Sequence, residues 1–279
     1  MKGADDMLRT AGDYVIPEAL KGTILEKIMH TRVHELIGAK SRLPADSIES
    51  VLDRAPAIRS FRRALTRRAP AVIAEIKRAS PSAGLLRKDF DPVKISEEYR
   101  SAGAAAISVL TEVQHFRGGL EILAQLRWAS RLPLLRKDFL IDPYQVLEAR
   151  LAGADAVLLI AALLDTSALR NMREEAERLG MEALVEVHDE AELQRALQSG
   201  ASVIGVNNRD LRSFEVSLDV ALGLARSMPK GILTVAESGI RTADDIRKLA
   251  AAGYQGFLVG EHLMRAPSPG VALSELLKN

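Results

Sequence analysis

Lysine and glutamate residues stand at the ends of several short apolar segments of this 279-residue chain. Glu75 and Lys77 lie two residues apart at the end of the first segment, Lys137 follows the third, and Glu186 ends the fifth. Side chains two apart on a strand share a face, so Glu75 and Lys77 can point in the same direction. Lysines and carboxylates in a partly dry pocket shift one another's pKa values, which places a protonated acid beside an ionised base. This combination suits chemistry at a carbonyl or an imine.

Polar residues also end the last three apolar segments, where they add an amide, a guanidinium and turns that contain glycine. They are Asn207, Arg209, Glu237, Ser238, Gly239, Gly260 and Glu261. Backbone N–H groups in such turns often bind phosphate after the seventh and eighth strands of a barrel. The alternatives are salt bridges inside the core and glycines that serve only as tight turns. Because five segments carry ionisable or amide groups at the same end, the pattern favours a catalytic site.

Eight short apolar segments after Pro70 predict the strands that position these groups. Before Pro70 the sequence is polar and helical in pattern, without a strand signal. Between each pair of segments there is room for one helix. The predicted strands are Ala71–Ile76, Ala105–Leu110, Leu132–Leu135, Ala156–Ile160, Glu182–Val187, Val203–Val206, Leu233–Glu237 and Gly256–Val259.

One joint recurs at four places between a helical pattern and the apolar segment after it. Its glycines are Gly103, Gly153, Gly200 and Gly253. Each stands where a helix ends in a left-handed residue, a conformation that glycine reaches without a Cβ penalty. A repeated joint of this kind indicates repeated βα units.

The repeated units predict an α/β chain, a (β/α)8 TIM barrel with an N-terminal helical extension. Strands covered by helices on both faces read as continuous apolar runs, and eight βα units fit the usual barrel length of about 250 residues. The alternative is an open doubly wound sheet, but no Gly-x-Gly-x-x-Gly turn follows the first strand. We expect a poorly ordered tail at residues 1–22, a helical extension at 23–70 and the catalytic barrel at 71–279.

The extension itself predicts an amphipathic helix from Thr23 onward and a second helix over Ala57–Thr66, which cap or flank the barrel. The apolar stripe of the first helix comprises Ile24, Leu25, Ile28, Met29, Val33, Leu36 and Ile37. The arginine pairs at 62–63 and 67–68 are typical of a solvated helix face.

Composition limits the classes of function. The chain has 38 Lys and Arg against 37 Asp and Glu, a formal charge of +1 that argues against a nucleic-acid partner. It has no Cys, which excludes disulfides and thiol nucleophiles and suits a cytoplasmic location. The longest purely apolar run, Ala156–Leu164, is far shorter than the roughly 18 residues of a membrane span, and we expect no signal peptide. The expected assembly is a monomer or a weak homodimer, because no apolar stripe stands out beyond the barrel helices.

Three histidines and the single tryptophan are expected to lie outside the catalytic site. His30 and His34 are four residues apart, but Thr31 replaces the Glu of a zinc motif, so we expect a solvated face and no metal. His188 shares a face with Glu186 and is expected beside the site rather than in it. Trp128 lies in an amphipathic pattern and is expected to pack.

Six phrases of the sequence resemble the indole-3-glycerol phosphate synthase family. They occur in the family's order and span about residues 23 to 275. The phrases are Ala74-Glu-Ile-Lys-Arg-Ala-Ser-Pro-Ser, Ser108-Val-Leu-Thr-Glu, Leu135-Arg-Lys-Asp-Phe-Leu-Ile-Asp-Pro-Tyr-Gln, Leu184-Val-Glu-Val-His, Gly205-Val-Asn-Asn-Arg-Asp-Leu and Ala236-Glu-Ser-Gly-Ile.

The resemblance implies a lyase of tryptophan biosynthesis. The implied substrate is the phosphorylated small molecule 1-(2-carboxyphenylamino)-1-deoxyribulose 5-phosphate. Ring closure with loss of carbon dioxide and water would yield indole-3-glycerol phosphate. No metal and no organic cofactor are implied, since acid, base and charge placement suffice for these steps.

The resemblance also implies residue roles. Lys137 is the general acid on the carbonyl oxygen, Glu186 is the general base, and Lys77 holds the substrate carboxylate and is a candidate acid for the dehydration. Glu75 orients the lysines and substrate hydroxyls, and Asn207 steadies Glu186. The other implied contacts are Ser238 beside the phosphate, Ser80, Gly239 and Gly260 on the phosphate, Phe116 and Phe139 as an apolar wall, and Arg209, Glu237 and Glu261 among the substrate-binding residues.

Two positions depart from the family pattern. Family members often carry Ser where Gly119 stands and a small residue where His262 stands, and the bulkier ring could narrow the phosphate end or add a hydrogen bond. A phosphoribosylanthranilate isomerase is a competing interpretation, but its Cys–Asp pair is impossible here. A catalytically silent barrel would lose acid and base, whereas Lys77, Lys137 and Glu186 are all present.

Overall fold

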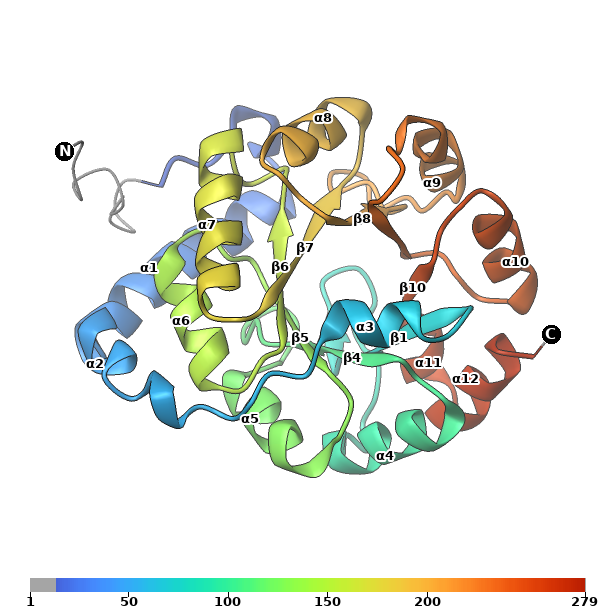
Figure 1. Cartoon of the computed structure of the whole chain (residues 1–279), viewed down its shortest axis with the longest axis horizontal. Coiled ribbons are helices and arrows are strands. Elements are labelled where there is room, and N and C mark those ends of the chain that lie inside the picture. The colour runs from blue at the N-terminus through green and yellow to red at the C-terminus, as the bar shows by residue number, and fades with distance from the viewer. Residues whose placement is uncertain (1–13, 279) are drawn as a thin grey trace.

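The computed structural model describes residues 14–278, and these form a closed barrel of parallel strands surrounded by helices (Figure 1). Neighbours in the chain pair with each other, and the first strand closes the ring by pairing with the last. This confirms the predicted (β/α)8 barrel with an N-terminal helical extension. The barrel strands are β1 (Ala71–Ile76), β4 (Ala106–Leu110), β5 (Leu134–Lys137), β6 (Ala156–Ile160), β7 (Glu182–Val187), β8 (Val203–Asn207), β9 (Leu233–Glu237) and β10 (Gly256–Val259).

Helices cover the outer face of the barrel, and a small antiparallel hairpin follows β1. None of the described helices is both long enough and apolar enough to pass through a membrane. The hairpin strands are β2 (Ala79–Ser80) and β3 (Gly84–Leu85). The covering helices are α4 (Pro92–Ala102), α5 (Leu120–Ala129), α6 (Pro143–Leu151), α7 (Thr166–Arg178), α8 (Glu190–Gln198), α9 (Asp219–Leu224), α10 (Ala243–Ala251), α11 (Glu261–Arg265) and α12 (Pro269–Leu276), with a short 3-10 turn η5 at Ala225–Ser227.

The barrel strands are buried on both faces, as their apolar sequences require. Every residue of β1, β4, β6, β8, β9 and β10 is buried. The third strand lies two residues later than the segment 132–135 predicted. Pro133 explains this shift, because it has no N–H to donate to a ladder, although its carbonyl accepts a bond from the Ile107 N–H.

The four recurrent glycines adopt the left-handed conformation that the repeated joint predicts. Their φ angles are 98° at Gly103, 90° at Gly153, 88° at Gly200 and 109° at Gly253. They follow α4, α6, α8 and α10, and each precedes the next strand by three residues. The joints therefore separate helix from strand as expected.

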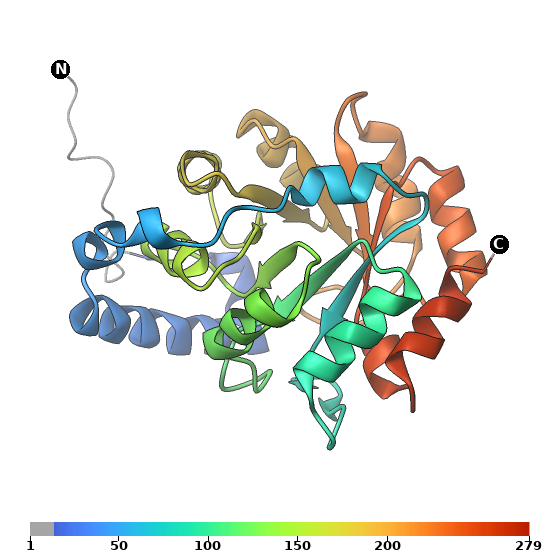
Figure 2. The same ribbon diagram turned by 60° about the horizontal axis from the view of Figure 1, so that its bottom comes forward.

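The N-terminal extension reaches from one end of the barrel to the other. In Figure 1, α1 (Ile24–Arg42) lies behind the barrel and α3 (Phe61–Thr66) lies in front of it. Figure 2 shows the linking segment along the side, where α2 (Ala45–Glu49) packs on α6; the segment also contains the 3-10 turn η4 (Leu52–Arg54). Thr23 caps α1 by accepting a hydrogen bond from the Glu26 N–H.

Parts of the extension differ from the sequence expectation. The stripe of α1 is buried at four of its positions, but Ile37 is 47% exposed because the barrel contact ends near Leu36. The second helix begins at Phe61 rather than Ala57. Residues before it are extended because the Arg59 N–H donates to Asp155 Oδ1 at 2.7 Å and the Arg59 guanidinium binds two barrel carbonyls.

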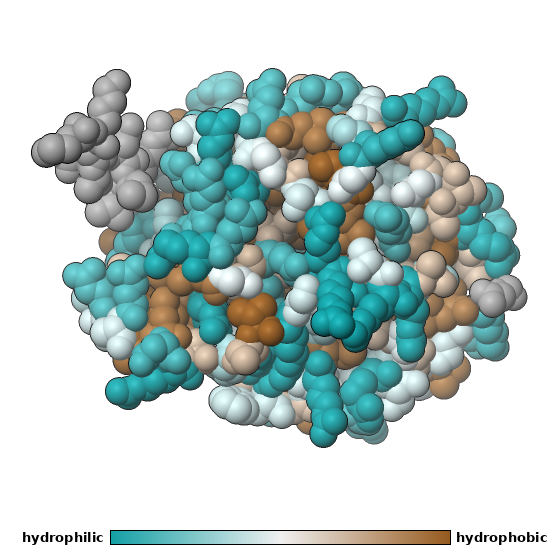
Figure 3. Space-filling view, viewed as in Figure 1, coloured by the Kyte–Doolittle hydropathy of each residue, from teal (hydrophilic) through white to brown (hydrophobic). Residues whose placement is uncertain are grey.

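The arginine pair at 62–63 lies in α3 and the pair at 67–68 directly follows it, at the amino-terminal ends of the barrel strands. Arg63, Arg67 and Arg68 are exposed, as expected, and hydrophilic side chains gather over α3 in Figure 3. Arg62 differs, since it is half-buried and its guanidinium donates to the carbonyls of Ser202 and Gly231. Arg62 therefore ties the extension to the loops that precede β8 and β9.

The segment before α1 is ordered where the structure describes it. Residues 1–13 of the expected tail lie outside the described residues. Residues 14–22 pack on the barrel instead of extending from it, since the Tyr14 hydroxyl donates to the Leu163 carbonyl at 3.1 Å and Leu20 of the 3-10 turn η3 (Glu18–Leu20) is buried. Apolar burial of Leu20 is the physical reason for this order.

Trp128 does not pack into the core. Its residue is 82% exposed, although the pattern of α5 predicted packing. Leu123 and Leu126 form the buried stripe of α5, and Trp128 lies two residues beyond Leu126, about 200° round the helix. That position faces solvent.

Candidate active site

A cavity of about 470 Å³ opens at the carboxyl ends of the barrel strands. It collects the residues that the sequence singled out from β1, β4, β5, β7, β8, β9 and β10 and the loops after them. The predicted site residues on its wall are Glu75, Lys77, Phe116, Lys137, Phe139, Glu186, Asn207, Arg209, Glu237, Ser238, Gly239, Gly260 and Glu261.

Two lysine–glutamate clusters lie in this cavity. Lys137 Nζ is 3.0 Å from Glu186 Oε2 and 3.2 Å from Glu237 Oε2. Lys77 Nζ is 2.5 Å from Glu75 Oε1. Glu75, Lys137, Glu186 and Glu237 come from β1, β5, β7 and β9, which are alternate strands of the ring. Alternate strands supply one layer of a barrel interior, so these four side chains meet at the same depth.

Burial and charge oppose each other in the Lys137 cluster. Burial alone would lower the pKa of Lys137, but the carboxylates of Glu186, Glu237 and Glu75 outweigh burial and raise the pKa of Lys137 above its usual value. Burial alone would raise the pKa of Glu186, but Lys137 and His188 hold the pKa of Glu186 well below its usual range. At neutral pH a charged lysine therefore lies beside an ionised glutamate.

Glu237 has the opposite character from Glu186. Burial raises the pKa of Glu237 to about 7; Lys137 opposes this rise and the charge of Glu186 adds to it. Glu237 Oε1 accepts no hydrogen bond within residues 14–278. A Cβ added to Gly205 on the neighbouring strand β8 would lie 2.1 Å from this oxygen. The absence of a side chain at Gly205 therefore makes room for the Glu237 carboxylate.

The loop after β8 brings an amide and a guanidinium to the cavity. Asn207 Oδ1 accepts a hydrogen bond from the Arg209 N–H at 3.1 Å, and the Asn207 side chain contributes to the low pKa of Glu186. Arg209 Nη2 lies 3.3 Å from Glu261 Oε2, which links the loops after β8 and β10.

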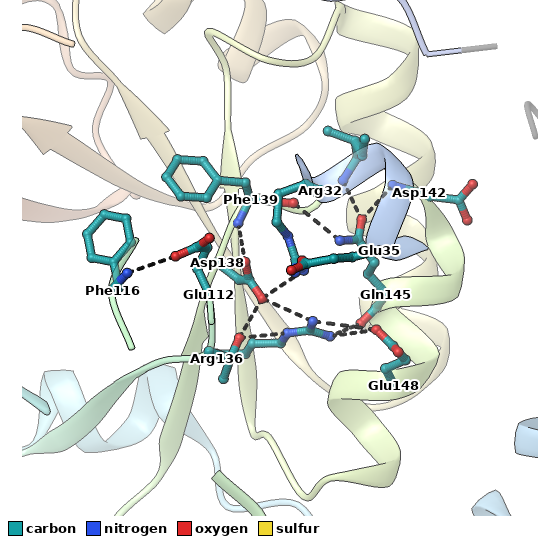
Figure 4. Close-up of polar contacts among 12 residues, drawn as sticks. Arg32, Glu35, Glu112, Phe116, Arg136, Asp138, Phe139, Asp142, Gln145 and Glu148 are labelled. Atoms are coloured by element: carbon teal, nitrogen blue, oxygen red, sulfur yellow. Dashed lines mark hydrogen bonds and ion pairs between the residues drawn. The ribbon is translucent and has the colours of Figure 1, made fainter. Parts of the chain in front are cut away.

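Two phenylalanines form an aromatic wall on the other side of the cavity. The ring centroids of Phe116 and Phe139 are 6.0 Å apart, with a tilt of 45°. Figure 4 shows that buried carboxylates hold their backbones: the Phe116 N–H donates to Glu112, and the Phe139 N–H donates to Asp138. An aromatic substrate ring could pack against this wall.

The loops after β9 and β10 form the opposite end of the cavity. Ser238 and Gly239 both have positive φ angles, 64° and 81°, so the backbone turns sharply after β9. Arg241, His262 and Arg265 also lie on this wall. Their cationic and hydrogen-bonding groups, together with the loop N–H groups, suit an anion such as a phosphate.

Ser80 is the one predicted site residue that is not on the cavity wall. It is buried in the β2–β3 hairpin, where its hydroxyl accepts a hydrogen bond from the Ala83 N–H at 3.2 Å. Its neighbour Pro81 lies on the wall instead. The structure therefore places the hairpin at the cavity but turns the Ser80 side chain into the turn itself.

Helix α1 also contributes to this cavity, which its sequence pattern did not indicate. Ile24, Leu25 and Ile28 lie on its wall. The apolar stripe of the helix was visible in the sequence, but nothing in it indicated whether the stripe faced the barrel side or the barrel mouth.

A buried ionic network fixes α1 in this position (Figure 4). Arg32 of α1 reaches Asp138 Oδ2 at 3.0 Å, and Arg136 of β5 reaches the same oxygen at 3.1 Å. Thr111 donates a hydrogen bond to it at 2.6 Å. These groups hold the pKa of Asp138 below its usual value against the effect of burial. Asp138 follows Lys137 directly, so the network joins the helix to the strand that carries the cavity lysine.

The histidines lie where the sequence placed them. His30 and His34 are exposed on α1, and His188 lies beside Glu186. No group of three or more His, Asp or Glu side chains in the described part of the chain is arranged to hold a metal ion. The polar side chains on the cavity wall are lysine, arginine and histidine groups, carboxylates, an amide and a hydroxyl.

Comparison with known proteins decides the family. The model of the family described as indole-3-glycerol phosphate synthase matches residues 25–276. The chain belongs to the indole-3-glycerol phosphate synthase family. Indole-3-glycerol phosphate synthases are carboxy-lyases of tryptophan biosynthesis. The match spans α1 from Leu25 onward, the whole barrel and every predicted site residue.

Individual indole-3-glycerol phosphate synthases are similar over nearly their whole length. The protein of Albidiferax ferrireducens is 50% identical over 258 residues, which cover 91% of this chain and 97% of that protein. The protein of Carboxydothermus hydrogenoformans is 49% identical over 263 residues, covering 91% and 99%. Among solved structures, a 3-hexulose-6-phosphate synthase aligns with a TM-score of 0.60 at 15% identity, over 74% of this chain and 97% of that one, and shares the fold.

Proposed function

We propose that this chain closes the indole ring of 1-(2-carboxyphenylamino)-1-deoxyribulose 5-phosphate and releases indole-3-glycerol phosphate, carbon dioxide and water. The observation that carries the proposal is the position of Lys137, between Glu186 and Glu237 in the centre of the cavity. The reaction needs an acid at the ribulose carbonyl and a base for a later proton, and this cluster holds a charged lysine and an ionised carboxylate side by side.

In the proposed reaction, the ring carbon attacks the carbonyl carbon, the carbonyl π electrons move to the oxygen, and Lys137 donates a proton to that oxygen. The new carbon–carbon bond leaves a cation, which draws the electrons of the carboxylate bond into the ring as carbon dioxide departs. Glu186 then removes a proton while the hydroxyl leaves as water, and aromaticity returns. Lys77 holds the substrate carboxylate and is a candidate acid for the last step, while Glu75 orients it from 2.5 Å.

The two ends of the cavity orient the substrate in this proposal. The anthranilate ring packs against Phe116 and Phe139, and the phosphate binds at the loops that carry Ser238, Gly239 and Gly260. Support for this direction comes from the 6.0 Å aromatic pair at one end and the arginines at the other. Arg209, Glu237 and Glu261 complete the proposed substrate contacts, whereas Ser80 is proposed to act through the hairpin that holds Pro81 on the cavity wall. The proposed chemistry uses no metal and no organic cofactor.

Fluorescence of the indole product tests the proposal. Purified protein is mixed with the carboxyphenylamino-deoxyribulose phosphate, and growth of indole fluorescence is followed for wild type, Lys137→Ala and the control Lys94→Ala on the exposed face of α4. We expect Lys137→Ala to lose about 10²- to 10⁴-fold of the turnover, since that is the usual contribution of an acid. Absence of product with wild type would reject the reaction, and full activity of Lys137→Ala would reject the role of Lys137.

We also propose the organisation expected from the sequence: a segment at 1–22, a helical extension at 23–70 and a catalytic barrel at 71–279. The enzyme is further proposed to act in the cytoplasm as a monomer or weak homodimer, without a nucleic-acid partner. The balanced charge and the absence of Cys support these points. Sedimentation equilibrium at micromolar concentration tests the assembly, because a stable trimer or larger species would contradict it.

A further inference from the structure

His188 lies behind Glu186 and has no role in the steps above. The two residues are two apart at the end of β7, so their side chains lie on the same side of the strand. The His188 ring lies between two carboxylates. Nε2 lies 3.3 Å from Glu186 Oε1 as an ion pair without hydrogen-bond geometry, and Nδ1 is hydrogen-bonded to Glu192 Oε2 at 2.9 Å. Only 14% of the ring side chain is exposed, and it is not on the cavity wall.

The partners of the ring define its protonation. A carboxylate oxygen accepts hydrogen bonds and donates none, so a ring nitrogen that faces one carries a proton. Nδ1 therefore carries a proton toward Glu192. Nε2 lies at ion-pair distance from the second carboxylate, Glu186, and two carboxylates beside one ring favour the imidazolium. Burial opposes this charge, but Glu186 and Glu192 outweigh burial and raise the pKa of His188 to about 10.

Glu192 is itself held firmly at the start of α8. Its Oε2 also accepts a hydrogen bond from the His188 backbone N–H at 2.9 Å, and Arg195 Nη2 lies 4.0 Å from its Oε1. The Glu192 N–H donates to Asp189 Oδ1 at 2.8 Å, which caps the helix. The ring of His188 is thus fixed from the side that faces away from the cavity.

We propose that His188, held by Glu192, is a positioning residue that orients the Glu186 carboxylate and keeps it ionised for its work as a base. The inference rests on the proposed function. Glu186 meets one cation at each oxygen, His188 at Oε1 and Lys137 at Oε2. The hydrogen bond from Lys137 at one oxygen and the ion pair with His188 at the other favour one orientation of the carboxylate. They also keep Glu186 beside Lys137, although the Glu237 carboxylate lies 3.2 Å from the same ammonium and competes for it.

Removing the imidazolium leaves two buried carboxylates around one lysine. Glu186 and Glu237 then share Lys137, and like charges in a dry site favour uptake of a proton by one of them. The other charged groups around His188 are Glu192, Asp189 and Arg195 of α8 and its cap, and none of them contacts Glu186. A neutral residue at position 188 therefore raises the pH at which Glu186 loses its charge.

The pH profile of kcat/KM tests this role. In His188→Gln the side chain keeps an amide N–H but loses the charge, so we expect the acidic limb to move upward by about one pH unit or more. We expect kcat near pH 7, where Glu186 is still ionised, to fall about tenfold because its carboxylate is less well oriented, with KM within about twofold. Glu192→Gln is expected to shift the limb in the same direction by a smaller amount, and the exposed neighbour Glu190→Gln is the matched control. An equal loss of activity at every pH, with an unmoved limb, would show a merely structural role and overturn the proposal.

NMR of histidine labelled with 15N provides a test that does not depend on turnover. The His188 signals are assigned by their absence in His188→Gln, or by their shift in Glu192→Gln if the first variant does not fold. We expect both nitrogens to carry protons at pH 8 in wild type, while the exposed His34 serves as the internal reference. A neutral His188 ring at that pH would overturn the proposal. If wild type forms no indole product, the function is rejected, but the NMR result still decides the state of His188.

Discussion

Gly260 leaves open the space that the Glu75 carboxylate occupies. A Cβ on Gly260 would lie 2.0 Å from Glu75 Oε1 and 3.1 Å from Glu75 Cβ. Gly205 stands in the same relation to Glu237, at 2.1 Å from Oε1. Both glycines belong to strands, or strand ends, that neighbour the carboxylate's own strand. Two of the buried carboxylates of the site thus need a glycine, which has no side chain, on the neighbouring strand.

The substitution Gly260→Ala tests this relation. Its methyl group would push Glu75 away from Lys77, and a displacement near 1 Å can cost about 100-fold in rate. We expect kcat/KM to fall about 10- to 100-fold, measured by indole fluorescence. Gly223→Ala in α9, where a Cβ meets nothing within 4 Å, is the control and should leave activity intact. Wild-type turnover in Gly260→Ala would contradict the argument.

Glu237→Gln should stabilise the fold at alkaline pH. The native pKa of Glu237 is about 7, above the ordinary 4.5, so the native state binds this proton more tightly than the unfolded chain does. The stabilising effect of the protonated carboxyl is complete below pH 4.5 and is lost as the pH rises through 7. The difference between these two pKa values corresponds to about 3 kcal/mol. We expect a gain of about 1–3 kcal/mol in the free energy of unfolding at pH 8 and little change at pH 4.5, from urea titrations. The exposed Glu215→Gln serves for comparison, and a gain of equal size at both pH values would refute the explanation.

Arg32→Met tests the attachment of α1. Loss of one partner from a buried ionic network costs about 3–5 kcal/mol when its counter-charge is left alone, and Arg136 still contacts Asp138 here. We therefore expect a loss of about 2–3 kcal/mol in thermal or urea unfolding. KM should rise, because Ile24, Leu25 and Ile28 would no longer close the cavity. Lys27→Met on the exposed face of α1 is the control. An unchanged KM in Arg32→Met would show that the position of α1 does not affect substrate binding.

Trp128 offers a direct check of the surface. It is the single tryptophan of the chain and is 82% exposed, so its fluorescence should be quenched by acrylamide nearly as strongly as that of free tryptophan. Trp128→Phe should change the free energy of unfolding by less than about 0.5 kcal/mol. It would also remove the protein's own signal from the indole assay. Strong protection from acrylamide would contradict the exposed position.

Most of the barrel was predictable because its signals are local. A left-handed glycine such as Gly103 and a fully buried strand such as Ala156–Ile160 each leave a mark in a few consecutive residues. Charged residues at strand ends were predictable for the same reason. Once strands are parallel, their carboxyl ends meet at one rim, and Lys137 and Glu186 must come together.

Long-range pairing was not predictable in this way. Arg32 looks like one more polar residue in an amphipathic helix, but it finds Asp138, 106 residues away, and is buried with it. The turn of Ser80 into its own hairpin depends on an Ala83 hydrogen bond that no periodicity encodes. Family resemblance supplied the substrate, which no residue pattern could have named.

The ring of Glu75, Lys137, Glu186 and Glu237 has consequences for symmetry. Because these residues come from every second strand, they repeat about the barrel axis with approximate four-fold symmetry. A substrate with an aromatic ring at one end and a phosphate at the other has no such symmetry. The strands alone therefore offer the substrate four nearly equivalent orientations about the barrel axis. The loops, aromatic after β4 and β5 and cationic after β9 and β10, are what select one of them.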